Sequence, residues 1–455
     1  MELMVSDIEN ATGELKDFHK GFHSHFVTRT KSVAEQALQY SQGLLFGSER
    51  KNMTNMEKIV PDSNHQALQN FTSNSQWDEE GVIAEIQRRI SELIGNPVHG
   101  SLQFDESGFL KDGENSVGVK RQYCGRFGKV DNCQVGVFLG YAMHSYRALV
   151  DKRLYLPVDW AEDQVRREHC GVPAWITFKT KAELALEMLS RAKERGVPFA
   201  WLGMDCFYGQ QPWLLDRLDR DGDIYIADVP NDTRVWRNCP TVEVPERKGK
   251  RGPHPRRERI VEGEPEPIEV RKIAEETPEE EKERVFLRDT ERKELWCNMV
   301  CLRVYQVREG LPGPESWLII LWDDNGEVKY QLSNASPGTK MKRLAEMSCS
   351  RYWIERALED AKGEVGMADY EVRGWLGWHH HMTMVLLAML FLLILHVKWK
   401  DKAPLLTIQD VREILEVVLP RKVITKEELL KMIKGKHKAR ESARRSHHKR
   451  NSKPN

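Results

Sequence analysis

The stretch KAELALEMLSRAKERGVPFAWLGMD, residues 181–205, decides the fold that we expect for this chain. Its first part predicts a helix over residues 181–195, because the apolar side chains fall mostly on one side of it. Thr180 and Glu183 have the spacing of a capping box at the start, and a glycine and a proline end the helix. A buried strand follows and ends on Asp205. This order is typical of an α/β sheet, in which active sites collect at the carboxyl ends of strands.

Three strand-like runs precede this stretch, over residues 101–105, 130–142 and 148–154. Strands that follow one another so closely predict an antiparallel start to the sheet. The first run ends on a second acid, Asp105. The sequence therefore predicts two aspartates at strand ends, separated along the chain and brought together by the sheet.

The rest of the chain predicts helices, strands and a charged connection. Predicted strands cover residues 223–229, 294–307, 315–322 and 327–332, and predicted helices cover residues 33–45, 79–93, 351–367 and 383–397. Residues 247–259, dense in Lys, Arg and Pro, and residues 275–283, dense in Glu, predict a flexible connection. Asp324-Asn-Gly326 predicts a hairpin turn.

Composition describes a globular protein of two or three folded units, with 455 residues, 40% hydrophobic and 30% charged residues and a formal net charge of zero. The charge is uneven, because residues 431–455 carry ten Lys and Arg against one Glu. Such a block is typical of a solvated arm that contacts nucleic acid, or of a tail that only aids solubility.

Cysteine usage and hydropathy bear on the compartment. The eight cysteines are scattered without a CxxC pair, which disfavours zinc and favours a reducing cytoplasm. The N-terminus lacks the pattern of a secretory signal. Residues 382–397 are strongly apolar but fall short of the roughly 18 residues of a membrane span, so we expect a buried core helix and no membrane partner.

Separated carboxylates suit the hydrolysis and transfer of phosphodiesters. Two Mg²⁺ ions held by acidic side chains activate an oxygen nucleophile and stabilise the leaving oxygen. Asp105 and Asp205 supply two acids, and we expect the third, Glu355, from the helix over residues 351–367. At 100° per residue Arg351, Glu355 and Lys362 share one helix face. Glu359 is a second possibility, and an exposed ion-paired face is the alternative explanation.

The spacing Arg351-x3-Glu355-x6-Lys362 resembles the R-E-K part of the Y-R-E-K signature in DDE transposases of bacterial cut-and-paste insertion sequences. Ser348 stands where the signature has tyrosine, and Tyr352 is near but out of register. The resemblance extends over residues 101–391 through Asp105-Glu-Ser-Gly-Phe-Leu-Lys111, Ser116-Val-Gly-Val-Lys-Arg-Gln-Tyr-Cys-Gly125, Lys129-Val-Asp-Asn-Cys-Gln-Val-Gly136, Asp205-x2-Tyr208-Gly209, Ala361-Lys-Gly-Glu-Val-Gly366, Tyr370-Glu-Val-Arg373 and Trp378-His-His-His381.

This resemblance implies a function and a set of site residues. It implies a transposase with Asp105, Asp205 and Glu355 as catalytic residues and ligands of two Mg²⁺ ions, for which Mn²⁺ substitutes. It implies that Arg351 and Lys362 contact DNA phosphates near the scissile bond, with cleavage through a hairpinned end as one of the routes left open. The implied partners are double-stranded transposon ends and target DNA, bound by a homodimer associated with the bacterial nucleoid. An insertion tryptophan that stacks on a flipped base is also implied, with Trp296, Trp317 and Trp322 as candidates.

The resemblance also implies an α/β fold with a ribonuclease-H-like catalytic core, an inserted mainly β subdomain and an N-terminal helical domain. The domains that we expect are residues 1–98 (helical, either DNA-contacting or a cap on the core), 99–234 (first part of the core), 235–335 (charged linker and β insertion), 336–400 (remainder of the core) and 401–455 (C-terminal helices and basic tail).

Other residues and other functions compete with this interpretation. Asp131, Asp228, Asp323 and Asp324 are alternative ligands, but their places at strand starts and ends favour roles in turns. His379–His381 are poor Mg²⁺ ligands, and we expect them to cap the buried helix or to touch DNA. The competing functions are a hydrolytic nuclease of the same fold and a domesticated DNA-binding protein without catalysis.

Overall fold

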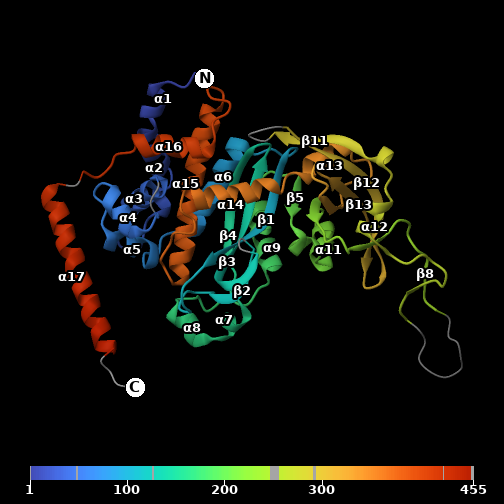
Figure 1. Cartoon of the computed structure of the whole chain (residues 1–455), viewed down its shortest axis with the longest axis horizontal. Coiled ribbons are helices and arrows are strands. Elements are labelled where there is room, and N and C mark those ends of the chain that lie inside the picture. The colour runs from blue at the N-terminus through green and yellow to red at the C-terminus, as the bar shows by residue number, and fades with distance from the viewer. Residues whose placement is uncertain are drawn as a thin grey trace.

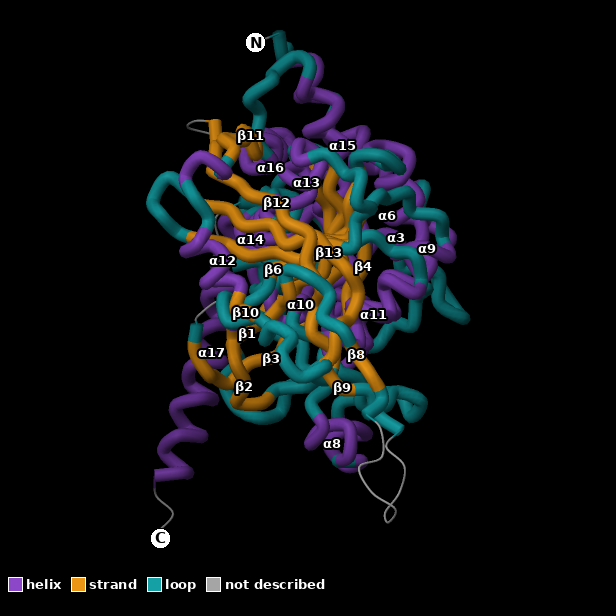
Figure 2. Tube along the Cα trace, turned by 90° about the vertical axis from the view of Figure 1, so that its right-hand side faces the viewer, coloured by secondary structure: helices purple, strands orange, loops and turns teal. Residues whose placement is uncertain are grey.

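A mixed sheet runs through the middle of the molecule, with helices on both sides (Figure 1, Figure 2). The computed structural model describes residues 2–47, 50–125, 128–245, 256–289, 294–423 and 425–451. Within these ranges twelve strands join one sheet: β1 (Gly100–Leu110), β2 (Lys120–Cys124), β3 (Lys129–Met143), β4 (Tyr146–Leu154), β5 (Trp201–Met204), β6 (Tyr225–Asp228), β7 (Arg234–Trp236), β10 (Ile268–Glu269), β11 (Glu283–Asp289), β12 (Glu294–Arg308), β13 (Leu311–Trp322) and β14 (Val328–Ser333).

The strand order is β10-β7-β12-β13-β14-β6-β5-β1-β3-β2, with β11 beside β12 and β4 beside β3. β1, β5 and β6 are parallel neighbours, whereas the other pairs are antiparallel. The predicted antiparallel start, β1 with β3 and β3 with β4, is confirmed. The mixed α/β class is therefore confirmed. A separate two-stranded ladder joins β8 (Val242–Glu243) and β9 (Arg259–Ile260).

The α9–β5 unit forms as its sequence predicts. α9 covers Lys181–Glu194, and the Oγ1 of Thr180 accepts a hydrogen bond from the Glu183 N–H at 3.2 Å. The Glu183 carboxylate accepts from the Thr180 N–H at 2.7 Å, which completes the capping box. Gly196 follows with a φ of +71°, a conformation that glycine adopts without a steric penalty.

The remaining helices pack on the sheet or on one another, and the last of them stands apart from the rest of the molecule (Figure 1). They are α1 (Val5–Glu9), α2 (Ala11–Lys20), α3 (Ala34–Leu45), α4 (Met53–Ile59), α5 (His65–Ser73), α6 (Glu79–Ile94), α7 (Val158–Glu162), α8 (Gln164–His169), α10 (Cys206–Gly209), α11 (Pro212–Arg220), α12 (Val270–Glu276), α13 (Met341–Ser348), α14 (Tyr352–Gly363), α15 (Trp375–Lys400), α16 (Ile408–Val418) and α17 (Lys426–Asn451), with short 3₁₀ turns at His23–His25 and Glu279–Glu281.

The strands of residues 235–335 continue the central sheet. β14 pairs antiparallel with β6, so β12, β13 and β14 extend the sheet beyond the parallel strands. α13 covers one face of this extension through Leu344 and Met347, and α12 covers the other face through Val270 and Ile273. The sequence predicted the strands and the turn at Asp324-Asn-Gly326, but not α12 or α13. Residues 275–283 are partly helical, and residues 246–255 of the predicted linker lie outside the described residues.

α15 is the central helix of the helical side (Figure 1). Its 26 residues are apolar and long enough to cross a membrane by length and composition, but 83% of its most apolar window is buried inside the protein. It packs on α3, α5 and α6 and on β4, and shares one hydrophobic core with them. The predicted buried core helix is therefore confirmed, and it begins eight residues earlier than the sequence indicated.

The three histidines near the start of α15 do not cap it, and in this respect the prediction is wrong. Gly374 occupies the cap position, and His379, His380 and His381 lie inside the helix with buried side chains. His380 lies over the ring of Trp77, at 3.9 Å between ring centroids, because the N-terminal helices pack directly on this part of α15. Buried in this way, the three side chains are not placed to touch DNA.

The basic tail, which the charge run predicted to be a solvated arm, forms the helix α17. The described residues of the basic tail are helical up to Asn451, and the described side chains are mostly exposed. In Figure 1 this helix stands apart from the rest of the molecule. Residues 452–455 of the predicted tail lie outside the described residues.

Candidate active site

Three aspartates lie at one level of the sheet, at the carboxyl edge of its parallel strands. Phe104 of β1 pairs with Met204 of β5, and Met204 pairs with Ala227 of β6. Each of these three residues is followed by an aspartate, so Asp105, Asp205 and Asp228 lie side by side on neighbouring strands. Because neighbouring strands are about 4.8 Å apart, the register alone places the three carboxylates in a row.

Asp105 does not end its strand, which corrects the sequence prediction. β1 continues to Leu110 along β3, and only its parallel pairing with β5 stops at Phe104. The Asp105 Oδ1 accepts a hydrogen bond from the Glu106 N–H at 2.7 Å. Burial, with the neighbouring Asp205 as a second cause, raises the pKa of Asp105 to about 7. The carboxylate thus lies in a setting where a nearby positive charge stabilises its ionised form.

Asp205 caps the short helix α10 directly after β5. Its Oδ1 accepts from the N–H groups of Phe207 at 3.0 Å and Tyr208 at 3.3 Å. Burial raises the pKa of Asp205, and the positive charge of Arg351 opposes this rise. The motif Asp205-x2-Tyr208-Gly209 is therefore a helix cap that fixes the direction of the carboxylate.

α14 lies over this edge of the sheet and brings the candidate third acid. Its Ile354 approaches the backbone of Gly140 in β3 so closely that a Cβ at Gly140 would lie 3.0 Å from the Ile354 Cγ1. Glu355, in the first turn, is half exposed and forms an ion pair with the Arg351 Nη2 at 2.7 Å. Glu359, the second possibility, pairs instead with Arg356 at 2.6 Å.

Arg351 lies among four carboxylates. Its Nε pairs with the Asp228 Oδ2 at 2.9 Å, in addition to the pair with Glu355. Burial alone would lower the pKa of Arg351, but the charges of Asp228, Glu355, Asp105 and Asp205 outweigh it, so the pKa is raised. The guanidinium is therefore the positive centre of an otherwise acidic site.

Lys362 lies at the far end of α14 and not beside the carboxylates. It is in the last turn of the helix, eleven residues after Arg351. At 1.5 Å per residue this is about 16 Å along the helix axis. Arg351 and Lys362 can therefore contact two separate phosphates from the predicted helix face, but they do not form one cluster.

The chemistry of the two aspartates fits a divalent metal ion. They are half-buried neighbours, and the charge of Asp205 raises the pKa of Asp105, which is a repulsion that a bound cation relieves. Glu355 is held by Arg351. In keeping with this, no group of three or more His, Cys, Asp or Glu side chains among the described residues is arranged to hold a metal ion. Asp105 and Asp205 thus fit the metal, whereas Glu355 is engaged elsewhere.

Sequence reasoning missed Asp228. It gave this residue a role in a turn, but the side chain pairs with Arg351 and accepts from the Gln331 Nε2 at 2.7 Å. A signal was present, because an apolar strand followed at once by an acid is the pattern that singled out Asp105 and Asp205. Asp323 does form a turn, since its Oδ1 accepts from the N–H groups of Asn325 and Glu327.

The two other alternative ligands have partners elsewhere in the molecule. Asp131 lies within β3 and pairs with Lys129 at 3.0 Å. Asp324 pairs with Arg284 at 2.7 Å. Neither carboxylate belongs to the row at the sheet edge.

A cavity of about 200 Å³ opens beside Arg351 and Glu355. Its wall includes Trp296 and Tyr352, and the guanidinium of Arg288 lies 3.4 Å from the centre of the Tyr352 ring. Of the three candidate tryptophans, Trp296 alone lines this cavity. Trp317 donates its indole N–H to the Ser336 carbonyl, and Trp322 contacts Lys282.

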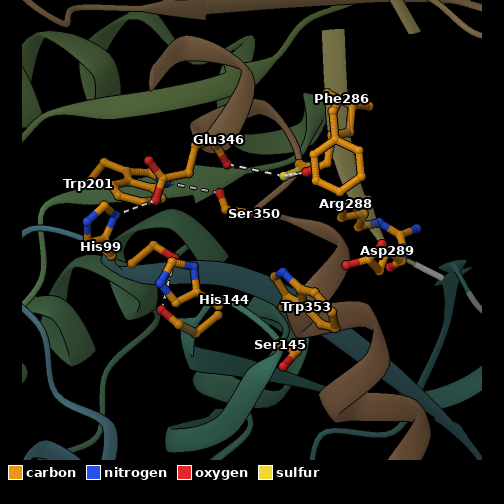
Figure 3. Close-up of a pocket in the computed structure, with 14 residues that line it drawn as sticks. His99, His144, Ser145, Trp201, Phe286, Arg288, Asp289, Glu346, Ser350 and Trp353 are labelled. Carbon is orange, nitrogen blue, oxygen red and sulfur yellow. Dashed lines mark hydrogen bonds and ion pairs between the residues drawn. The ribbon is translucent and has the colours of Figure 1, made fainter. Parts of the chain in front are cut away.

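A second cavity, of about 280 Å³, lies at the starts of β1 and β5, which are the strand ends away from the carboxylates (Figure 3). There His99 pairs with Glu346 at 2.7 Å, and the Trp201 indole N–H donates to the Ser350 Oγ at 3.0 Å. These contacts tie α13 and the loop after it to the starts of β1 and β5. Ser101 lines this cavity, and Asp105 lies four residues further along β1. At 3.3 Å per residue this is about 13 Å, so the cavity is separate from the row of Asp105, Asp205 and Asp228.

Comparisons with known proteins show the family to which this sequence is similar. The family model described as DDE superfamily endonuclease matches residues 17–294, which include Asp105, Asp205 and Asp228. The probable transposase for insertion sequence element IS701 of Microchaete diplosiphon is 30% identical over 174 residues. This match spans 37% of this chain and 41% of that protein, so less than half of the relative is covered. The family match extends over more than half of the chain, and the protein belongs to the DDE superfamily endonucleases.

Proposed function

We propose that this protein is a DNA transposase that cleaves the ends of a mobile element and joins them to target DNA. The observation that carries the proposal is the row of carboxylates at the carboxyl edge of the parallel strands, with Glu355 and Arg351 above it. Membership of the endonuclease family and the similarity to an insertion-sequence transposase support it. Within the family, the Arg351-x3-Glu355-x6-Lys362 spacing favours the Y-R-E-K branch.

In this proposal Asp105, Asp205 and Glu355 are the catalytic residues and metal ligands. These residues would hold two Mg²⁺ ions, or Mn²⁺ in their place, which would supply activation of the attacking oxygen and stabilisation of the leaving 3′ oxygen. Asp105 and Asp205 present their carboxylates at fixed places, since the backbone N–H groups of Glu106, Phe207 and Tyr208 orient them. Glu355, which pairs with Arg351 in this structure, would be the third residue to hold the metal.

DNA contacts follow from the positions of the cations. Arg351 binds a phosphate at the scissile bond, and Lys362 binds one farther along the same strand. The 16 Å between them along α14 correspond to roughly five base-pair steps of duplex, at 3.4 Å per step. Trp296 is the tryptophan that we propose to stack on a flipped base, because it lines the cavity beside Arg351 and Glu355.

Larger-scale features are part of the same proposal. We propose a ribonuclease-H-like core over residues 99–234 and 336–400, an inserted β unit over residues 235–335 and an N-terminal helical domain over residues 1–98. Pairing of two DNA ends requires two active sites, so a homodimer on DNA is proposed. The protein acts in the bacterial cytoplasm, at the nucleoid, where its DNA substrates are.

Single neutral substitutions test the catalytic assignment. We expect Asp105→Asn, Asp205→Asn and Glu355→Gln each to abolish Mg²⁺-dependent cleavage of end-bearing DNA, by at least about a thousandfold, because each removes a ligand charge. Binding of the same DNA, measured by gel shift, is expected to remain. Asp324→Asn, which lies outside the row, serves as the matched control. Normal cleavage by any of the three variants removes that residue from the site.

A hydrolytic endonuclease is the second candidate, because the family description names cleavage and not joining. Incubation with end-bearing DNA and a target plasmid separates the two functions. A transposase gives covalently joined products, whereas a nuclease gives only cut ends.

A further inference from the structure

Asp228 is a fourth acid in the site, and the proposed chemistry does not use it. Ala227 pairs with Met204 in parallel register, so the carboxylate of Asp228 is the next one along the sheet from Asp205. On its other side Asp228 faces Gln331 of β14, which pairs with it antiparallel. The residue therefore sits at the junction between the parallel strands and the added antiparallel strands.

Both carboxylate oxygens of Asp228 have partners on other elements. Oδ2 pairs with the Arg351 Nε at 2.9 Å, and Oδ1 accepts from the Gln331 Nε2 at 2.7 Å. The Gln331 Nε2 also donates to the carbonyl of Ser348, the last residue of α13, at 3.3 Å. The side chain of Asp228 is only 18% exposed, so water screens this pair weakly. Asp228 thus holds the guanidinium of Arg351 from the sheet side.

The position of Arg351 decides how much negative charge is left for a cation. Its guanidinium interacts with Asp105 and Asp205 as well as with its two direct partners. A free guanidinium would move toward these two aspartates and compete with a divalent ion for them. With its Nε held by Asp228 and its Nη2 on Glu355, it stays at the rim of the row.

We propose that Asp228 is a positioning residue that anchors Arg351 at the rim of the active site and so keeps Asp105 and Asp205 available to the divalent metal. This inference rests on the proposed function, which makes those two aspartates metal ligands. Asp228 acts through Arg351 and does not touch the reacting atoms.

Metal binding without DNA tests this role. The probe is Mn²⁺, titrated into the full-length protein and followed by calorimetry, so the readout does not depend on catalysis. Asp228→Asn keeps the shape and the hydrogen bond from Gln331 but removes the charge that holds Arg351. We expect its Mn²⁺ affinity to fall about tenfold, because the coupling free energies between residues in contact are commonly of this size. Asp324→Asn, the matched control, should bind like the wild type.

A double-mutant cycle separates anchoring from a general loss of negative charge. In an Arg351→Gln background no guanidinium is left to compete, so adding Asp228→Asn should weaken Mn²⁺ binding by less than about threefold. An equal loss with and without Arg351 overturns the inference, and so does wild-type affinity in Asp228→Asn.

Two further variants keep the test decisive. If thermal unfolding shows that Asp228→Asn is not folded, Arg351→Lys breaks the same anchor, because a lysine cannot bridge Asp228 and Glu355 as a guanidinium does. It should lower the affinity similarly, and unchanged binding overturns the inference. Asp105→Asn and Asp205→Asn test the proposed function separately: if they bind Mn²⁺ like the wild type, the metal site itself is wrong, whatever Asp228 does.

Discussion

At the scale of single residues, the backbone leaves little room around the carboxylates. Gly209 ends α10, and a Cβ at this position would lie 2.1 Å from the backbone oxygen of Asp228. No side chain fits this distance, so glycine allows α10 to pack against β6. The same contact fixes the spacing between the two strand ends that carry Asp205 and Asp228.

Substitution of Gly209 is therefore expected to disturb the site through packing. We expect Gly209→Ala to lower the free energy of unfolding by about 1–3 kcal/mol, the usual cost of overpacking. Gly363→Ala is the matched control, since a Cβ there meets nothing within 4 Å. Urea denaturation of both variants measures the difference, and equal stabilities would show that α10 moves without cost.

At the scale of elements, α15 carries buried histidines that must stay neutral. Burial lowers the pKa of His381 to about 3 and that of His380 to about 4. His381 hydrogen-bonds with the Tyr40 hydroxyl at 2.8 Å, and His380 with the Thr72 carbonyl at 3.0 Å, so both link α15 to the N-terminal helices. The unfolded chain takes up these protons near pH 6.5, whereas the folded chain does not.

This difference gives the stability a definite pH dependence. The contribution of each histidine to the free energy of unfolding is fully present above pH 6.5. It is lost as the pH falls toward the pKa in the folded state, which is about 3 for His381 and about 4 for His380. At pH 5 the loss amounts to about 2 kcal/mol for each buried histidine. We expect His381→Gln to lose about 2 kcal/mol less between pH 7 and pH 5 than the wild type. His437→Gln, exposed on α17, controls for the removal of a histidine.

Denaturation curves at the two pH values check this prediction. The Gln variant also lacks part of the contact with Tyr40, so its stability is expected to be lower at both values. The pH-dependent difference is the quantity that decides. An identical difference in wild type and variant would mean that His381 takes up a proton in the folded state.

At the scale of the whole molecule, one sheet supports both the site and the strands that flank it, while α17 stands outside. α17 carries ten Lys and Arg against three Glu, in a chain whose formal net charge is zero. Its apolar side chains Leu429, Leu430 and Ile433 are about half exposed. A helix that buries so little is stabilised when a polyanion neutralises its charge.

Neutralisation of four cations on α17 tests whether it contacts DNA. We expect the combined variant Lys434→Gln, Lys436→Gln, Lys438→Gln and Arg440→Gln to bind DNA more weakly at low salt. The slope of log affinity against log salt should become shallower by about 2–4. Filter binding over a range of salt concentrations measures this, and circular dichroism shows whether the helix persists. An unchanged slope would leave α17 as a solubilising tail.

Much of the local structure was predictable, because it depends on neighbours in the sequence. The capping box joins Thr180 and Glu183, which are only three residues apart. α9 and β5 come directly after it in the sequence, and the pattern of apolar residues within each element predicts it. The hairpin at Asp324-Asn-Gly326 and the burial of α15 are likewise set by composition over a short range. α13 was not predicted; it packs on β11 and on β5, contacts that a short run of sequence does not contain.

The sequence by itself therefore determined the strands that carry the acids Asp105 and Asp205, and the apolar core helix. Only the tertiary structure decided that Asp228 joins the row, that Arg351 bridges it to Glu355 and that Lys362 lies apart. The physical reason is that local patterns fix hydrogen bonds and side-chain faces within an element. The lateral register of strands 23 to 100 residues apart is set by long-range pairing and packing, which no local pattern encodes.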